Sequence, residues 1–140
     1  MKKLLVFALF SGLVSTATYA QDCETLVKEF EKILKGKDNR FVYDGNVNTA
    51  LLDREKAEFK TTFFGGSTYR IAATAGNDDT YVIFTVKDMQ GNILFTNKNH
   101  KNSSYWDFKV PKTLPVVIET ELDLDKKVTG CAVMMIGFKR

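Results

Sequence analysis

The chain has 140 residues, 44% of them apolar, and carries 20 basic against 17 acidic side chains. This is the length of a single domain with enough apolar side chains for one core. Basic residues stand beside acids, as where Lys126 and Lys127 follow Asp123 and Asp125. A nucleic-acid groove needs clustered, uncompensated cations, so we expect no nucleic-acid partner.

Residues 1–20 have the features of a secretory signal peptide. Two lysines precede an apolar run over 4–14, which is too short to span a bilayer, and small residues end the segment at Ala20. We expect cleavage after Ala20, with a cut after Ala17 as the alternative. The protein is therefore predicted to be secreted or periplasmic.

Residues 21–140 are then the mature protein, which we predict to be a single β-sandwich domain. Its two cysteines, Cys23 and Cys131, lie near its two ends. Polar residues precede Cys23, where a lipid-acceptor cysteine has small or aliphatic neighbours, so we expect no membrane anchor. An even number of cysteines in an exported protein favours a disulfide, and only one pairing exists. The alternative is two free thiols.

The segment 22–35 is the one expected helix. Its apolar residues recur at the spacing of one helix face: Cys23, Leu26, Val27, Phe30, Ile33 and Leu34. Asp22 can cap its first turn, and Gly36 can end it because glycine tolerates the left-handed conformation. We therefore predict an amphipathic helix that buries one face.

Beyond this helix, the pattern changes to that of strands. Turn-forming residues fill 36–48, and we expect Leu51 and Leu52 to add only a short helical turn. Seven strands are then expected, at 57–63, 69–75, 81–86, 93–96, 105–110, 116–124 and 130–138. Most alternate apolar and polar residues, as a strand with one solvated face does. The strands 81–86 and 130–138 are instead apolar on both faces.

The last expected strand determines the predicted architecture. One of its faces can pack on an opposing sheet, but the face with Cys131 needs another cover. The amphipathic helix also bears a cysteine, Cys23, so we place it across the outer face of that sheet, bridged to Cys131. The predicted fold is mainly β: a two-sheet antiparallel β-sandwich, jelly-roll-like, with the N-terminal helix packed on the outside of a sheet.

The sequence assigns no catalytic residue. The one histidine, His100, lies in a hydrophilic loop without apolar residues to hold it, whereas general bases are oriented by supporting side chains. The two cysteines and this histidine lack the spacing of a zinc site. Acidic residues on or near strands leave a glycosidase-like hydrolase as an alternative: Asp107, Glu119, Glu121 and Asp123.

Two other groups are candidate binding residues. Asp78 and Asp79 lie in a loop with the oxygen ligands that calcium prefers, so calcium is the one cofactor considered. Plain turns use the same residues. Tyr105 and Asp107 should face outward from a strand whose inner side includes Trp106, and they are the candidate contacts for a ligand.

The second half of the chain carries a run of features typical of small exported sandwiches. They are the segments 69–71, 77–79, 84–88 and 91–95, followed by a closing apolar strand. In this order they resemble the jelly-roll sandwiches of bacterial pre-peptidase C-terminal domains. The resemblance implies a non-catalytic appendage of secreted enzymes that, in some members, binds calcium or polysaccharide. The whole chain is also similar to short exported proteins of Bacteroidota-type bacteria.

The expected function is that of an exported, non-enzymatic binding or accessory protein for a protein or glycan whose identity the sequence does not give. The alternatives are the carboxylate-dependent hydrolase and a structural or inhibitory partner of another secreted protein. A hydrolase needs two carboxylates whose environments separate their pKa values. Exposed apolar area on one sheet would favour a protein partner.

Overall fold

A computed structural model describes residues 23–35, 40–76 and 81–139. The expected signal peptide and the expected calcium ligands Asp78 and Asp79 lie outside this part of the chain. The helix and strands of the described part are α1 (Cys23–Lys35), β1 (Val42–Asp53), β2 (Ala57–Phe63), β3 (Ser67–Thr74), β4 (Val82–Lys87), β5 (Ile93–Thr96), β6 (Tyr105–Val110), β7 (Leu114–Leu122) and β8 (Thr129–Lys139). A short 3-10 helix, Asn97–His100, follows β5.

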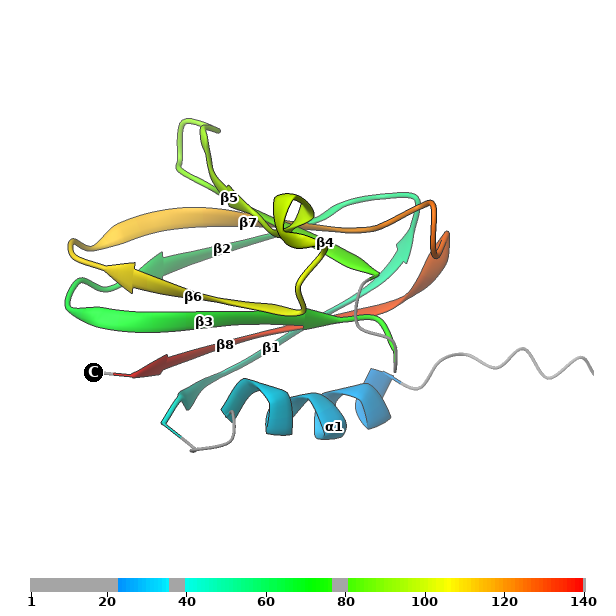
Figure 1. Ribbon diagram of the computed structural model, residues 1–140, viewed down its shortest axis with the longest axis horizontal. Helices are drawn as coiled ribbons and strands as arrows, with labels where there is room; N and C mark the ends of the chain where they lie inside the picture. The colour runs from blue at the N-terminus through cyan, green and yellow to red at the C-terminus, as the bar shows by residue number, and fades with distance from the viewer. Residues whose placement is uncertain (1–22, 36–39, 77–80, 140) are drawn as a thin grey trace, which may run out of the picture.

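The strands form two antiparallel sheets of four strands each (Figure 1). Sheet A has the order β1-β8-β3-β6, and sheet B has the order β2-β7-β4-β5. Every neighbouring pair is antiparallel. The predicted mainly-β fold with two antiparallel sheets is therefore confirmed.

The main core lies between the two sheets. Alternation along each strand sends every second side chain inward, and these inner residues form one buried cluster: Leu52, Phe63, Tyr69, Ile71, Ala73, Ala75, Val82, Phe84, Val86, Val110, Val116, Ile118, Leu122, Ala132, Met134 and Ile136. The predicted central strand, now β4, is buried on both faces. It lies between β7 and β5, as its apolar sequence requires.

The closing strand β8 is also buried on both faces, as predicted. It lies inside sheet A between β1 and β3. Its outer face meets α1, which lies on the side of sheet A away from sheet B (Figure 1). This second buried cluster contains Leu26, Phe30, Leu34, Ala72, Cys131, Val133 and Met135. The helix thus buries its apolar face on the strand that needed a cover.

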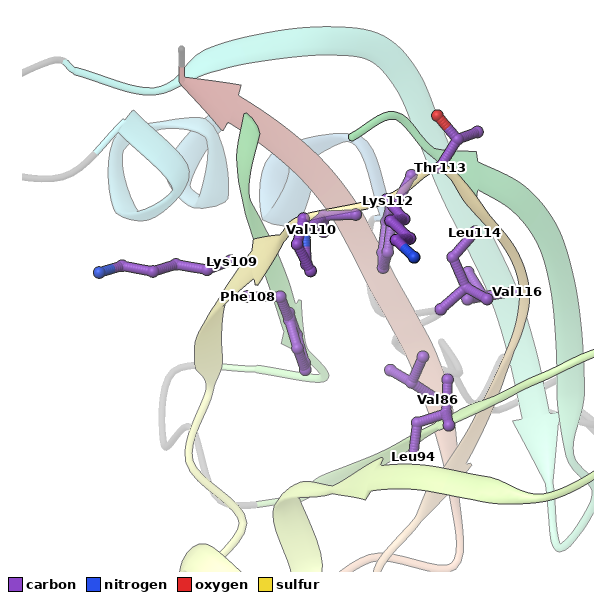
Figure 2. A pocket seen from close by; sticks show the side chains of 11 residues that line it. Val86, Leu94, Phe108, Lys109, Val110, Lys112, Thr113, Leu114 and Val116 are labelled. Carbon is purple, nitrogen blue, oxygen red and sulfur yellow. The ribbon is translucent and has the colours of Figure 1, made fainter. Parts of the chain in front are cut away.

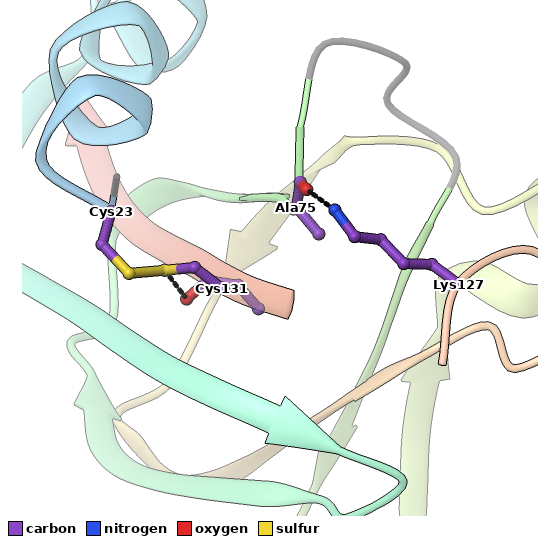
Figure 3. The surroundings of a disulfide bond; sticks show 5 residues. Cys23, Ala75, Lys127 and Cys131 are labelled. Atoms are coloured by element: carbon purple, nitrogen blue, oxygen red, sulfur yellow. Dashed lines mark hydrogen bonds between the residues drawn. A yellow bond between two sulfur atoms is a disulfide. The ribbon is translucent and has the colours of Figure 1, made fainter. Parts of the chain in front are cut away.

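A disulfide joins the start of α1 to β8. Cys23 and Cys131 are bridged with their Cα atoms 5.9 Å apart, and 108 residues separate them in the sequence. The predicted pairing is therefore present (Figure 3). At the same end of the molecule, Lys127 Nζ donates a hydrogen bond of 2.7 Å to the Ala75 carbonyl. Burial lowers the pKa of this lysine below its ordinary value.

The expectation for the segment before β2 was wrong. Residues 36–39 of the expected turn segment lie outside the described part of the chain. Instead of turns over 42–48 and a helical turn at Leu51 and Leu52, the chain forms β1 over Val42–Asp53 and pairs with β8. A bulge interrupts the register around Gly45, whose φ is +89°. Bulged strands lose the simple alternation that reveals a strand. Leu52 is buried in the core, while Leu51 points outward and is 80% exposed.

Candidate functional site

The two residues predicted to contact a ligand both contact Arg70. Its guanidinium makes two hydrogen bonds to Asp107, Nε to Oδ1 at 2.7 Å and Nη2 to Oδ2 at 2.9 Å. Its central carbon also lies 4.6 Å from the ring centre of Tyr105 and 4.1 Å from that of Phe41. The pair therefore belongs to a packed cluster on the outer face of sheet A. Ligand binding by Tyr105 and Asp107 stays a prediction.

Among the carboxylates considered for a hydrolase, Asp107 is on a different sheet from Glu119 and Glu121, which share Lys56. Asp107 lies on the outer face of sheet A, whereas Glu119 lies on the outer face of sheet B. Glu119 accepts hydrogen bonds of 2.7 Å from both Lys56 and Lys87, and Lys56 also lies 3.1 Å from Glu121. The two lysine hydrogen bonds hold the pKa of Glu119 below its ordinary value. A proton donor in catalysis needs the opposite shift.

His100 is held more firmly than the sequence indicates. Its ring lies 4.2 Å from that of Trp106 and 5.3 Å from that of Phe95, measured between ring centres. The prediction of a loop histidine without apolar support was wrong, because the fold brings two aromatic residues from other segments beneath it. The imidazole remains exposed. Trp106 itself is half-buried and packs against the core, as expected.

The described part of the chain contains no group of three His, Cys, Asp or Glu side chains that could hold a metal ion. The two expected calcium ligands are outside it, so the calcium prediction stays open. No helix within the described residues is long and apolar enough to cross a membrane.

One recess that sequence reasoning missed is an apolar cavity between the sheets. Its volume is about 510 Å³, and it opens where the edge strands β5 and β6 leave the sandwich uncovered (Figure 2). Its lining comes from β2, β4, β5, β6, β7 and the β6–β7 loop: Phe63, Val86, Leu94, Phe108, Lys109, Val110, Pro111, Lys112, Thr113, Leu114 and Val116. This volume is within the usual range for small-molecule sites, roughly 300–1,000 Å³.

Aromatic side chains support the inner wall of the cavity. Phe108 lies edge-on to Phe95 with ring centres 5.1 Å apart, and Phe63 stacks on Phe108 at 6.3 Å. Phe95 stacks in turn on Trp106 at 4.9 Å. Closely packed rings hold one another in place. The cavity wall is therefore preformed, and Trp106, the one tryptophan of the chain, lies in contact with it through Phe95.

The β6–β7 loop at the cavity mouth is fixed to the turn that follows β2. Gly65 N donates to Thr113 Oγ1 at 3.1 Å, and Gly66 N donates to the Val110 carbonyl at 2.7 Å. A Cβ on Gly65 would lie 3.0 Å from Lys112 Cα, so glycine permits this close approach. The mouth is therefore held by backbone contacts.

A bulge in β5 supplies the opposite side of the mouth. The register with β4 skips Leu94, since Phe95 pairs with Val86 and Ile93 pairs with Lys87. A bulge redirects a side chain that regular alternation would turn away. Leu94 lines the cavity and is still 50% exposed. The cavity is thus open to solvent beside an apolar residue.

The opposite open edge of the sandwich, between β1 and β2, differs in chemistry. Two smaller recesses there, of about 340 and 230 Å³, share the polar residues Asp44, Asn46 and Thr61 and the apolar Ile136, and the larger of the two also includes Phe64 and Phe138. These two recesses mix polar and apolar side chains, whereas the lining of the cavity at the β5–β6 edge is apolar except for two lysines and one threonine.

Little in the sequence could have located the apolar cavity. Phe108 and Val110 were expected in the core, and nothing local shows that the core is incompletely covered beside them. The clearest signal is that β5 is apolar at two consecutive positions, Ile93 and Leu94, although it lies at a sheet edge.

In comparisons with known proteins, no family model matches the chain and no curated protein gives a significant match.

Proposed function

We propose that the mature protein is an exported, non-enzymatic binding protein that holds one small apolar molecule, typically an acyl chain, in the cavity at the β5–β6 edge. The observation that carries this proposal is the cavity itself, with its apolar lining and its opening to solvent. Small-molecule sites are concave, mostly apolar and largely preformed. This cavity has all three properties.

The energetics of burial favour an apolar occupant. Each methylene group moved from water into such a cavity contributes about 0.8 kcal/mol, which is a roughly fourfold gain in affinity per group. The only hydrogen-bonding side chains of the lining belong to Lys109, Lys112 and Thr113. Thr113 already accepts a hydrogen bond from Gly65. A sugar ring would find few partners here, so the glycan expected from sequence is the weaker proposal for this cavity.

Two features support the exported, accessory part of the proposal. The strand orders 1-8-3-6 and 2-7-4-5 are those of two interleaved Greek keys, which supports a jelly roll. The Cys23–Cys131 bridge supports an oxidising compartment, because disulfides persist mainly there. The ion-paired states of Asp107 and Glu119 support a non-enzymatic role, since both carboxylates are engaged by cations.

The test is binding of the neutral fluorophore N-phenyl-1-naphthylamine to the oxidised mature protein. We expect a saturable fluorescence increase with one probe per protein and an accompanying change in Trp106 emission. Leu94→Glu places a charge at the cavity mouth and should weaken binding at least tenfold.

Leu51→Glu is the matched control, because Leu51 is an equally apolar and more exposed residue on the opposite edge. This variant should bind the probe like the wild type. The proposal fails if the wild type does not bind the probe saturably, or if the two glutamate variants weaken binding equally.

A further inference from the structure

The cavity lining also indicates which class of apolar molecule it takes, an inference that rests on the proposed function. We infer that the ligand is an acyl chain with a single anionic head group, a carboxylate, and that Lys112 is the residue that binds this head group. The chain lies among the apolar residues of the cavity, and the head group stays at the mouth.

The charge of the lining is the first observation. Its eleven residues include two lysines and no acid. The lysines paired with acids in the described part of the chain are Lys56, Lys87 and Lys126. Lys112 is exposed, and among the described residues no acid pairs with it. The mouth therefore offers a positive charge that no acid of the described segments neutralises.

The directions of the two lysines distinguish them. Lys109 extends away from the other lining side chains, whereas Lys112 lies between Val110 and Leu114 at the cavity (Figure 2). Lys109 stands beside Thr68 on the outer face of sheet A, because it alternates with the inward residues Phe108 and Val110. A lysine can keep its stem on apolar surface and its ammonium in water. Lys112 is the one placed to do so over the mouth.

The loop that carries Lys112 is held in place before a ligand arrives. Its backbone packs on Gly65 so closely that a Cβ there would lie 3.0 Å from Lys112 Cα and 3.0 Å from Thr113 N. Preorganisation reduces the entropy lost on binding. The lining places one ammonium at the mouth, whereas phosphate sites combine several N–H donors or an arginine fork, so a carboxylate is favoured.

The experiment is displacement of N-phenyl-1-naphthylamine by four ligands with the same chain: dodecanoate, dodecanol, methyl dodecanoate and dodecyl phosphate. The proteins are the wild type, Lys112→Met, which keeps an apolar stem of similar length, and the matched control Lys109→Met. We expect the wild type to bind dodecanoate roughly three- to tenfold more tightly than dodecanol. This ratio lies between the contribution of an exposed ion pair and the larger contribution of a charge-assisted hydrogen bond.

The preference should disappear in Lys112→Met and persist in Lys109→Met, with dodecanol binding unchanged in both. It should also shrink at high salt, because an exposed ion pair is screened. Equal binding of dodecanoate and dodecanol by the wild type, or a preference that survives Lys112→Met, overturns the inference while leaving the proposed function intact. Tighter binding of dodecyl phosphate overturns the carboxylate assignment. Failure of every ligand and of the probe would instead refute the proposed function.

Discussion

Leu34 of α1 packs directly on Gly137 of β8. A Cβ on Gly137 would lie 3.3 Å from Leu34 Cδ1 and 3.3 Å from the Val42 carbonyl oxygen. Leu34 is fully buried in this position. The last turn of the helix therefore approaches sheet A at a position of β8 where no side chain separates them, and this contact adds to the disulfide at the other end of α1.

Gly137→Val should lower the free energy of unfolding by about 1–3 kcal/mol, because the added methyl groups overpack this contact. Strand propensity alone predicts that Gly137→Val raises the free energy of unfolding, since valine is favoured in strands and glycine is not. Urea denaturation of the oxidised protein distinguishes the two effects. A variant as stable as the wild type would show that α1 does not dock this closely.

Leu34→Ala provides a double-mutant cycle for the same contact. Alone it should cost about 2–5 kcal/mol, because it leaves a cavity under the helix. Combined with Gly137→Val, the loss should be smaller than the sum of the two single losses, since the valine fills part of the space. Strictly additive losses would mean that the two residues do not touch.

The Cys23–Cys131 bridge should contribute substantially to stability. It closes a loop with a sequence separation of 108 residues, for which the chain-entropy model gives up to about 5 kcal/mol and experiments typically give 2–5. We expect a reductant to lower the Tm of the wild type. The variant with Cys23→Ala and Cys131→Ala should already have the lower Tm and should not respond. An unchanged wild-type Tm after both thiols become alkylatable would contradict this expectation.

Glu119 should make the protein sensitive to acid. The Glu119 side chain is 12% exposed and bonded to Lys56 and Lys87, and these hydrogen bonds lower its pKa in the folded state. The ionised Glu119 side chain therefore makes its full contribution to the free energy of unfolding above the ordinary glutamate pKa, about 4.3. It is lost as the pH falls through the lower folded-state pKa. Chemical denaturation between pH 3 and 7 should show this loss in the wild type.

Glu119→Gln should lower stability at pH 7 by about 1–2 kcal/mol, since hydrogen bonds to charged groups are stronger than neutral ones. The stability of this variant should also fall less steeply in acid. Glu121→Gln is the control, because Glu121 is more exposed and contacts only the half-exposed Lys56 among these lysines. Its effect should be small. Equal effects of the two substitutions would mean that the network across β2, β7 and β4 does not hold Glu119.

The sequence predicts those parts of the fold whose pattern is local. β2 and β6 alternate cleanly, and β4 and β8 are apolar on both faces, so each could be recognised without its neighbours. The position of α1 followed from β8, whose second face needed a cover. β7 was placed two residues late at both ends, at 116–124 instead of Leu114–Leu122. In the sequence Leu124 continues the alternation, but the chain turns at Asp123, whose carbonyl accepts a hydrogen bond from Lys126 N.

β1 and the cavity could not be predicted, because both depend on contacts between distant segments. β1 has polar residues on its inner side and a bulge at Gly45, and it is a strand through its pairing with β8, about 80 residues later. One side of the cavity mouth is the β6–β7 loop, which is fixed on Gly65, 48 residues before its partner Thr113. The Arg70–Asp107 pair could not be predicted for the same reason, since no local sequence pattern shows that β3 pairs with β6.

Asp107→Asn tests whether Asp107 serves to stabilise the fold through Arg70 or to bind a ligand together with Tyr105, as the sequence predicts. Arg70 has a side chain that is 13% exposed, and it would lose its charged partner. We expect a loss of about 1–3 kcal/mol in the free energy of unfolding. Binding of N-phenyl-1-naphthylamine should not change, since the cluster is on the outer face of sheet A. Weaker probe binding by a folded Asp107→Asn protein would place the ligand site at Tyr105 and Asp107 instead.

Gly65→Ala should deform the mouth of the cavity. Its Cβ would meet backbone atoms of Lys112 and Thr113 at 3.0 Å, closer than most Cβ contacts in proteins, so the β6–β7 loop must shift slightly. We expect a loss of about 1–3 kcal/mol in stability and severalfold weaker binding of the probe. Gly66→Ala is the control: at φ +86° it is strained by a similar amount, but its Cβ meets nothing within 4 Å. It should lower the Tm without changing the affinity for the probe. Only Gly65→Ala displaces the β6–β7 loop. If both variants bind the probe with equal affinity, the position of this loop does not shape the binding site.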